Sequence, residues 1–242
     1  ATALNGEAGL IFDGSKLGIG TSTMTKTLNV TDTTASASTG IQLIGANDGT
    51  QFLNFGDTDD TNVGEINYDH SLDKMNFRTN DAYAMVIDSA GRVTKPLQPA
   101  FMSLNGGGTT LANATDVTVT LDTEIFDIGS NISGNTFTAP ITGKYYFSGS
   151  VVADAGAGNN TRFEESHIYI NCSNRKLKFG EEQHYTNIND WWAMSVSGLI
   201  DMDANDTCTL TYFGRRQSGS GTCVTVGSST DFRTGLSGYL VA

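Results

Sequence analysis

Proline, cysteine, histidine and basic residues are all scarce in this chain. Its 242 residues include 3 prolines, 3 cysteines and 3 histidines, and 14 Lys and Arg stand against 26 Asp and Glu, a net charge of −12. Such an acidic chain is a poor ligand for the phosphate backbone, so we expect no nucleic-acid partner. No apolar run approaches the ~18 to 20 residues that span a bilayer, so we expect no membrane insertion.

The residues that are abundant favour strands over helices. Gly, Thr, Ser, Asn and Asp dominate the composition and suit strands joined by tight turns. Over residues 1–95, short apolar patches recur at strand-and-turn spacing, each with few large side chains. One copy could hardly bury enough surface to offset its chain entropy, so we expect three copies to pool these patches in a homotrimer. A small independent sandwich, the alternative, would need denser alternation.

Two phrases in this first part resemble known sequences. "LGIGTSTMTKTLNV" (17–30) and "RTNDAYAMVIDSAGRVTKP" (78–96) resemble segments that recur in bacteriophage tail-fibre shafts. In such shafts the second phrase leads into another GIGT turn, whereas here it leads into "KPLQPAF". Pro96 and Pro99 suit a short stiff junction. We therefore expect residues 1–96 to form an intertwined trimeric fibre shaft and residues 97–242 to form a separate head.

The second part alternates strongly. In "NTFTAPITGKYYFSGSV" (135–151) a proline and glycine turn precedes a strand with large side chains on both faces. One face is expected to carry Tyr145, Phe147, Gly149 and Val151, and the other Tyr146, Ser148, Ser150 and Val152. This pattern predicts that one face packs inside a sandwich and the other against neighbouring subunits.

Three phrases in order, "FTAPITGKYYFSGSV", "VSGLIDMDANDT" and "FRTGLSGYLVA", resemble the heads of complement and the tumour-necrosis-factor superfamily. That resemblance covers about residues 100–242 and implies a trimeric, ten-stranded jelly roll. With the shaft phrases, the whole chain resembles bacteriophage tail-fibre or head-fibre proteins that carry such a head. The expected fold is therefore all-β.

This resemblance implies a fibre on the virion surface, assembled in the host cytoplasm and joined to other virion proteins through its N-terminal end. We expect the trimeric head to bind a host-cell receptor, a glycan in preference to a protein. The alternative is a purely structural fibre or decoration protein whose jelly roll is a trimerisation cap. A third possibility, a glycan depolymerase, needs a carboxylate pair in a defined motif that the sequence lacks, so we expect no enzyme.

Material for acid-base chemistry is sparse, because the only histidines are His70, His167 and His184. On an alternating strand, Glu165 would share a face with His167, and Glu182 with His184. No third ligand or nucleophile motif accompanies either pair. We interpret both as polar contacts.

Two stretches are candidate recognition surfaces. "HYTNINDWW" sets amides and carboxylates beside two tryptophans that face opposite ways if extended, and exposed aromatics can stack on sugars; the alternative is that both are core or interface. "GRRQSGSG" reads as a basic loop tip, or as a plain solvated hairpin end. The candidate receptor-binding residues are His184, Tyr185, Asn187, Asn189, Asp190, Trp191, Arg215 and Arg216.

The acidic turn "DMDAND" is a candidate calcium site. Asp201, Asp203 and Asn205 have the alternate spacing of oxygen ligands. An ordinary Asx turn that bonds its own backbone is the alternative. No other cofactor is expected.

The cysteines allow one candidate disulfide. If "CTLTYFGRRQSGSGTCV" is a hairpin turning near Arg215 and Arg216, Cys208 lies opposite Cys223. The alternative is that both are small buried apolar residues in a reduced protein.

Overall fold

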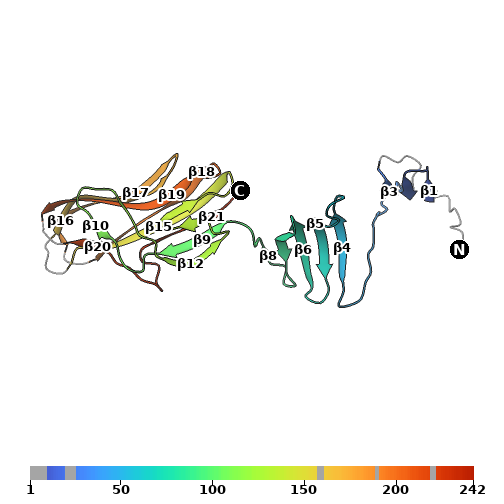
Figure 1. Cartoon of the computed structure of the whole chain (residues 1–242), viewed down its shortest axis with the longest axis horizontal. Coiled ribbons are helices and arrows are strands. Elements are labelled where there is room, and N and C mark those ends of the chain that lie inside the picture. The colour runs from blue at the N-terminus through green and yellow to red at the C-terminus, as the bar shows by residue number, and fades with distance from the viewer. Residues whose placement is uncertain (1–9, 20–25, 157–160, 189–190, 219–221) are drawn as a thin grey trace.

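A computed structural model describes residues 10–19, 26–156, 161–188, 191–218 and 222–242, and within these ranges every regular element is a strand. Figure 1 shows a small sheet, a second sheet and a larger sandwich following one another along the long axis of the chain. None of the described residues forms a helix with the length and hydropathy that crossing a bilayer requires. The expected all-β class is confirmed.

Two small sheets come first. A three-stranded sheet consists of β1 (Leu10–Phe12), β2 (Leu17–Ile19) and β3 (Leu28–Val30). A five-stranded antiparallel meander follows, made of β4 (Thr50–Phe55), β5 (Gly64–Asp69), β6 (Lys74–Thr79), β7 (Ala82–Ile87) and β8 (Val93–Thr94). In both sheets each strand lies beside its sequence neighbour, because the connections are short.

The two faces of the meander differ in chemistry. On one face Asn76 donates to Asn67 Oδ1 at 2.7 Å, and Asn67 in turn donates to Glu65. The other face carries an apolar row in register across four strands: Leu53, Ile66, Phe77 and Met85. Leu53 is 55% exposed within one chain. The apolar row therefore lacks a full cover from its own chain.

The remaining strands form a sandwich of two antiparallel sheets. The front sheet contains β9 (Ala100–Leu104), β10 (Thr110–Leu111), β12 (Thr123–Ile128), β15 (Gly143–Asp154), β18 (Trp191–Met202), β20 (Cys223–Thr225) and β21 (Gly235–Leu240). The back sheet contains β11 (Val117–Thr118), β13 (Ile132–Ser133), β14 (Thr136–Thr138), β16 (Thr161–Cys172), β17 (Lys176–Ile188) and β19 (Thr207–Ser218).

The chain passes repeatedly between these two sheets. The front sheet has the central order β18-β15-β21-β9 and the back sheet the order β14-β19-β16-β17, so β15 to β16, β17 to β18 and β18 to β19 are all crossings. This interleaving of antiparallel strands is the jelly-roll arrangement. Thirteen strands occur where ten were expected, because the edges of the sandwich break into pieces of two or three residues such as β10, β11 and β13.

The core confirms the alternation expected for β15. Tyr145, Phe147 and Val151 are fully buried, whereas their alternate neighbours face outward. The Tyr145 hydroxyl donates to the carbonyl of Ile141 at 2.8 Å, which ties the strand to the turn before it. At Gly149 a Cβ atom would lie 2.7 Å from Leu210 Cδ1 of the opposite sheet. The "PITGKYYFSGSV" pattern thus reflects core packing across the sandwich.

The predicted Cys208–Cys223 disulfide is wrong. Cys208 is bonded to Cys172, its register partner in the neighbouring strand β16, and Cys223 is free and buried. The predicted hairpin does not form because β19 runs through Arg215 to Ser218. Cys223 then lies in β20, which belongs to the front sheet, on the other side of the core from Cys208.

The junction before the sandwich is fixed by the C-terminal strand. Pro99 is buried, and its carbonyl accepts a hydrogen bond from the Leu240 amide at 2.9 Å. The Gln98 side chain donates to the Leu240 carbonyl. The chain therefore enters the sandwich at β9, directly beside its own C-terminal strand β21.

Candidate functional site

The outward face of the front sheet carries a row of large side chains. Leu199, Tyr146 and Tyr239 are register partners across β18, β15 and β21. Leu199 is 59% and Tyr239 50% exposed, and the two tyrosine rings lie 5.5 Å apart. Aromatic and aliphatic groups aligned on an open sheet face are typical of protein contact surfaces.

The next two rows on this face consist of serines. Ser148 lies between Ser197 and Ser237, and Ser150 lies beside Ser195. The Ser150 hydroxyl donates to the carbonyl of Arg233 at 2.6 Å, so it is satisfied within the chain. Because these side chains are small, another protein surface can approach the backbone of this part of the sheet closely.

An aromatic and charged cluster ends the same face, away from the five-stranded sheet. Trp191, at the start of β18, is 51% exposed, and the Arg233 guanidinium lies 5.4 Å from its ring centre. Asp231 holds Arg233 with an ion pair of 3.0 Å, and Phe232 between them is 40% exposed. Trp and Arg often dominate the binding energy of protein contacts, and Phe is enriched in them.

The outward face of the back sheet has different chemistry. The ring of His167 stacks on Phe213 with 4.8 Å between centres. Lys176 Nζ lies 4.7 Å above the Tyr169 ring, and Arg215 lies 3.9 Å from Glu165. We name these side chains the back strip, which comprises Glu165, His167, Tyr169, Lys176, Phe213 and Arg215.

Charged groups of the back strip pair with one another within the chain. Glu165 Oε1 lies 3.3 Å from His167 Nδ1, so the two predicted to share a face do so. Burial raises the pKa of the Tyr169 hydroxyl, and a hydrogen bond with Asp116 raises it further. Tyr169 therefore stays neutral at ordinary pH, and at 4% exposed it packs beneath Lys176 rather than acting as an acid or base.

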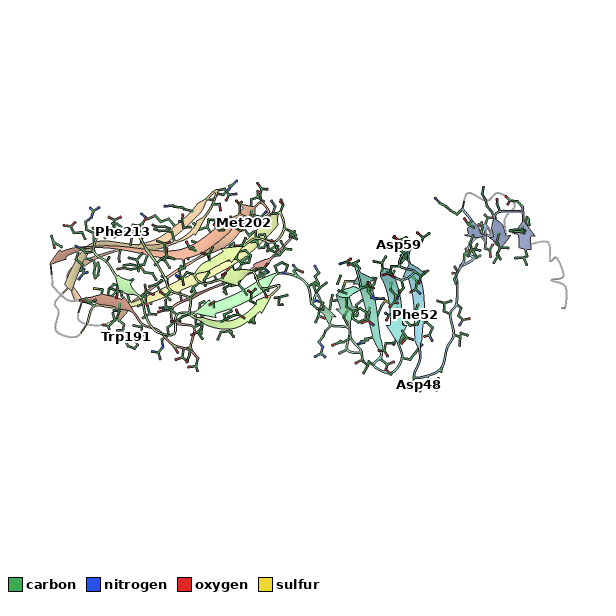
Figure 2. All side chains as sticks on the ribbon, in the orientation of Figure 1. Asp48, Phe52, Asp59, Trp191, Met202 and Phe213 are labelled. Carbon is green, nitrogen blue, oxygen red and sulfur yellow. A yellow bond between two sulfur atoms is a disulfide. The ribbon has the colours of Figure 1, made fainter. Side chains whose placement is uncertain are left out.

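The predicted recognition residues do not form one patch. Trp191 points outward from the front sheet and Arg215 outward from the back sheet, so they lie on opposite faces; Figure 2 shows Trp191 and Phe213, two residues before Arg215, on opposite sides of the sandwich. Trp192 is 7% exposed and packs in the core against Phe163. The two tryptophans therefore face opposite ways, as expected for an extended strand, and a receptor-binding role for Trp191 stays a prediction.

The remaining predicted residues fall on the back sheet or beyond the described residues. His184, Tyr185 and Asn187 lie in β17, two strands from Arg215, and their side chains fall outside the described part of the structure. Asn189 and Asp190 lie outside the described residues. Arg216 follows Arg215 in β19 and therefore points to the opposite face of the sheet. Its backbone amide donates to Asn113 Oδ1 at 2.7 Å.

The acidic turn lies at the end of β18 nearer the five-stranded sheet. Lys144 Nζ lies 2.7 Å from Asp201 Oδ1, and this ion pair lowers the pKa of Asp201. Asp206 accepts from the Asp203 amide at 2.9 Å, and Asn205 has a left-handed backbone with φ of 74°. Within the described part of the chain no three His, Cys, Asp or Glu side chains are placed to hold a metal ion. Calcium binding here stays a prediction.

Several residues of these surfaces are absent from the sequence predictions. Arg233, paired with Asp231, reaches Trp191 from the connection between β20 and β21, a contact that no local pattern indicates. Leu199 and Tyr239 had a usable signal, because each follows the same alternation that marks its strand. Applying the two-face interpretation of β15 to β18 and β21 would have found both.

Comparisons with known proteins give a fold likeness and no family. No protein-family model matches the chain, and no curated protein matches it. The globular domain of zebrafish complement 1qA protein is 14% identical, with a TM-score of 0.42, over 60% of this chain and 98% of that one. Murine APRIL is 11% identical, with a TM-score of 0.38, over 60% of this chain and 99% of that one. The PRD1 vertex protein P5 is 9% identical, with a TM-score of 0.41, over 60% and 99%. Likeness this weak adds nothing to the strand order, which by itself defines the jelly roll.

Proposed function

We propose that the chain is a virion fibre protein whose head trimerises through the front face and binds a host-surface glycan for adsorption. The observation that carries the proposal is the front face itself: the Leu199–Tyr146–Tyr239 row, the serine rows and the Trp191 cluster extend over one sheet. A long exposed face that is rich in aromatic and aliphatic side chains favours self-association of the single chain. The proposal includes attachment to other virion proteins through the N-terminal end and no catalysis.

The receptor contact is assigned to the back strip. A trimer closed through the front faces leaves the back sheets outside, where three copies can bind a repeated sugar surface together. Arg215 is half exposed beside Phe213, so a charge and an aromatic edge are offered together. That combination suits glycans, which present hydroxyl and carboxylate groups beside apolar ring faces.

The test measures assembly and adhesion separately on the whole chain. Light scattering at several concentrations should give a constant trimer mass, and the protein should bind one member of a panel of bacterial surface polysaccharides. Arg215→Glu should abolish that binding and leave the mass unchanged, whereas Arg92→Ala, which removes an exposed arginine outside the sandwich, should change neither. A monomer, or binding that survives Arg215→Glu, would contradict the corresponding half of the proposal.

A purely structural fibre or decoration protein is the second candidate. The observation that favours it is the internal satisfaction of the back strip, since Lys176 covers Tyr169 and Glu165 pairs with Arg215. Such contacts stabilise the sheet without any ligand. A stable trimer that binds no polysaccharide of the panel would support this candidate.

A further inference from the structure

Residues 38–45, between the two small sheets, form an extended segment without backbone partners. No hydrogen bond joins these residues to any other described part of the chain. Ile41, Leu43 and Ile44 are 71%, 57% and 82% exposed. A backbone already extended, with apolar side chains in water, is a strand that lacks a sheet.

The five-stranded sheet has an edge that lacks a strand. The outer side of β4 has no neighbour in the sheet order, and Phe52 and Phe55 on it are 50% and 54% exposed. A hollow of about 420 Å³ lies beside this strand, and both Phe52 and Leu53 of β4 and Ile41 and Leu43 of the segment line it. Both an unpaired strand and an unpaired edge therefore border one apolar space.

The turn before β4 does not pair residues 38–45 with β4 of the same chain. The Gly49 amide donates to the Ala46 carbonyl at 3.0 Å, so a turn leads the segment past β4, as Figure 1 shows between β3 and β4. A hairpin closed by this turn would set Leu43 opposite Phe52, but the backbone bonds of such a pair are not formed. Leu43 and Phe52 line the hollow instead.

We propose that residues 38–45 of one copy add as a strand to the β4 edge of the next copy. Each chain offers one unpaired strand and one unpaired edge, so copies of this chain alone satisfy every site, and three such contacts close a ring. The segment 38–45 is long enough to pair with all six residues of Thr50–Phe55, and both carry large apolar side chains. This inference rests on the proposed homotrimer and assigns the contact that links its copies outside the sandwich.

The test is a cross-link between different chains of the full-length protein. One chain carries Leu43→Cys, and a second, distinguished by a size tag, carries Gln51→Cys, Phe52→Cys or Leu53→Cys in turn. The two chains are assembled together and oxidised. We expect at least one pair to give a tagged-to-untagged disulfide, about tenfold above a control pair in which the second chain carries Leu72→Cys, an equally exposed position on the β5–β6 turn. Native thiols add little background, because Cys172 and Cys208 are bonded and Cys223 is buried.

Three outcomes overturn the inference, and they are distinguishable. If the protein is a trimer by light scattering and no pair exceeds the Leu72→Cys control, the proposed function stands and the strand addition fails. If chains carrying both Leu43→Cys and Phe52→Cys cross-link only within themselves, the segment completes its own hairpin instead. If the unmodified chain is a monomer, the proposed homotrimer itself is wrong and the inference falls with it.

Discussion

The disulfide between Cys172 and Cys208 should set much of the stability of the sandwich. It closes a loop with a sequence separation of 36 residues that contains all of β17 and β18, so it restricts the unfolded chain over the strands that cross between the sheets. The loop-closure relation gives about 13 cal/mol/K for a loop of this size, or about 4 kcal/mol at 25 °C. With a urea dependence of about 2 to 3 kcal/mol/M, reduction should lower the urea midpoint by about 1 to 2 M.

The assay is urea unfolding followed by tryptophan fluorescence, because both tryptophans, Trp191 and Trp192, lie in the sandwich. Reduction should destabilise the wild type and leave Cys208→Ala unaffected. Cys223→Ala is the control: it should cost about 1 kcal/mol and keep the full response to reduction. If Cys223→Ala abolishes the response instead, or if a nonreduced digest joins Cys208 to Cys223, the pairing described above is refuted.

Three further predictions concern the two faces, the core and acid stability. Leu199→Asp should reduce the mass in solution to that of a monomer, because three buried carboxylates would face one another, whereas Asn171→Asp on the back sheet should leave it unchanged; light scattering checks both. Trp192→Ala should lower the free energy of unfolding by about 3 to 5 kcal/mol by circular dichroism, and half-exposed Trp191→Ala by less than about 2 kcal/mol; equal losses would contradict the burial difference. The amide of Gly106, with that of Gly107, lowers the pKa of Asp122. A depressed folded pKa gives stability above about pH 4 that is lost as pH falls, so wild type should lose more stability than Asp122→Asn between pH 5 and 2 in acid unfolding curves.

The local sequence pattern predicts how side chains divide between the two faces of a strand in the sandwich. Alternation in residues 143–154 predicted how the side chains of β15 divide between two faces, because a strand between a core and an outer surface must alternate with a period of two; it did not say which face is buried. The same rule correctly separated Trp191 from Trp192. Side-chain periodicity is a property of the strand alone, so no knowledge of the other strands is needed.

The sequence did not predict which strands pair with each other. The Cys208–Cys223 prediction assumed that β19 turns back on itself, but its partner β16 lies some forty residues earlier in the chain. The contact of Arg233 with Trp191 likewise joins segments that only the sheet order brings together. Strand pairing depends on the packing of the whole domain, so a single segment does not determine it.

The position of β9 beside β21 has a mechanical consequence. Tension transmitted from the five-stranded sheet enters the sandwich at Ala100 and runs along β9, which is bonded on one side to β21 and on the other to β12. Interstrand hydrogen bonds lie perpendicular to their strands, so this pull loads both ladders in shear, and their bonds must yield together rather than one after another. The junction should therefore resist stretching along the chain far better than sideways peeling.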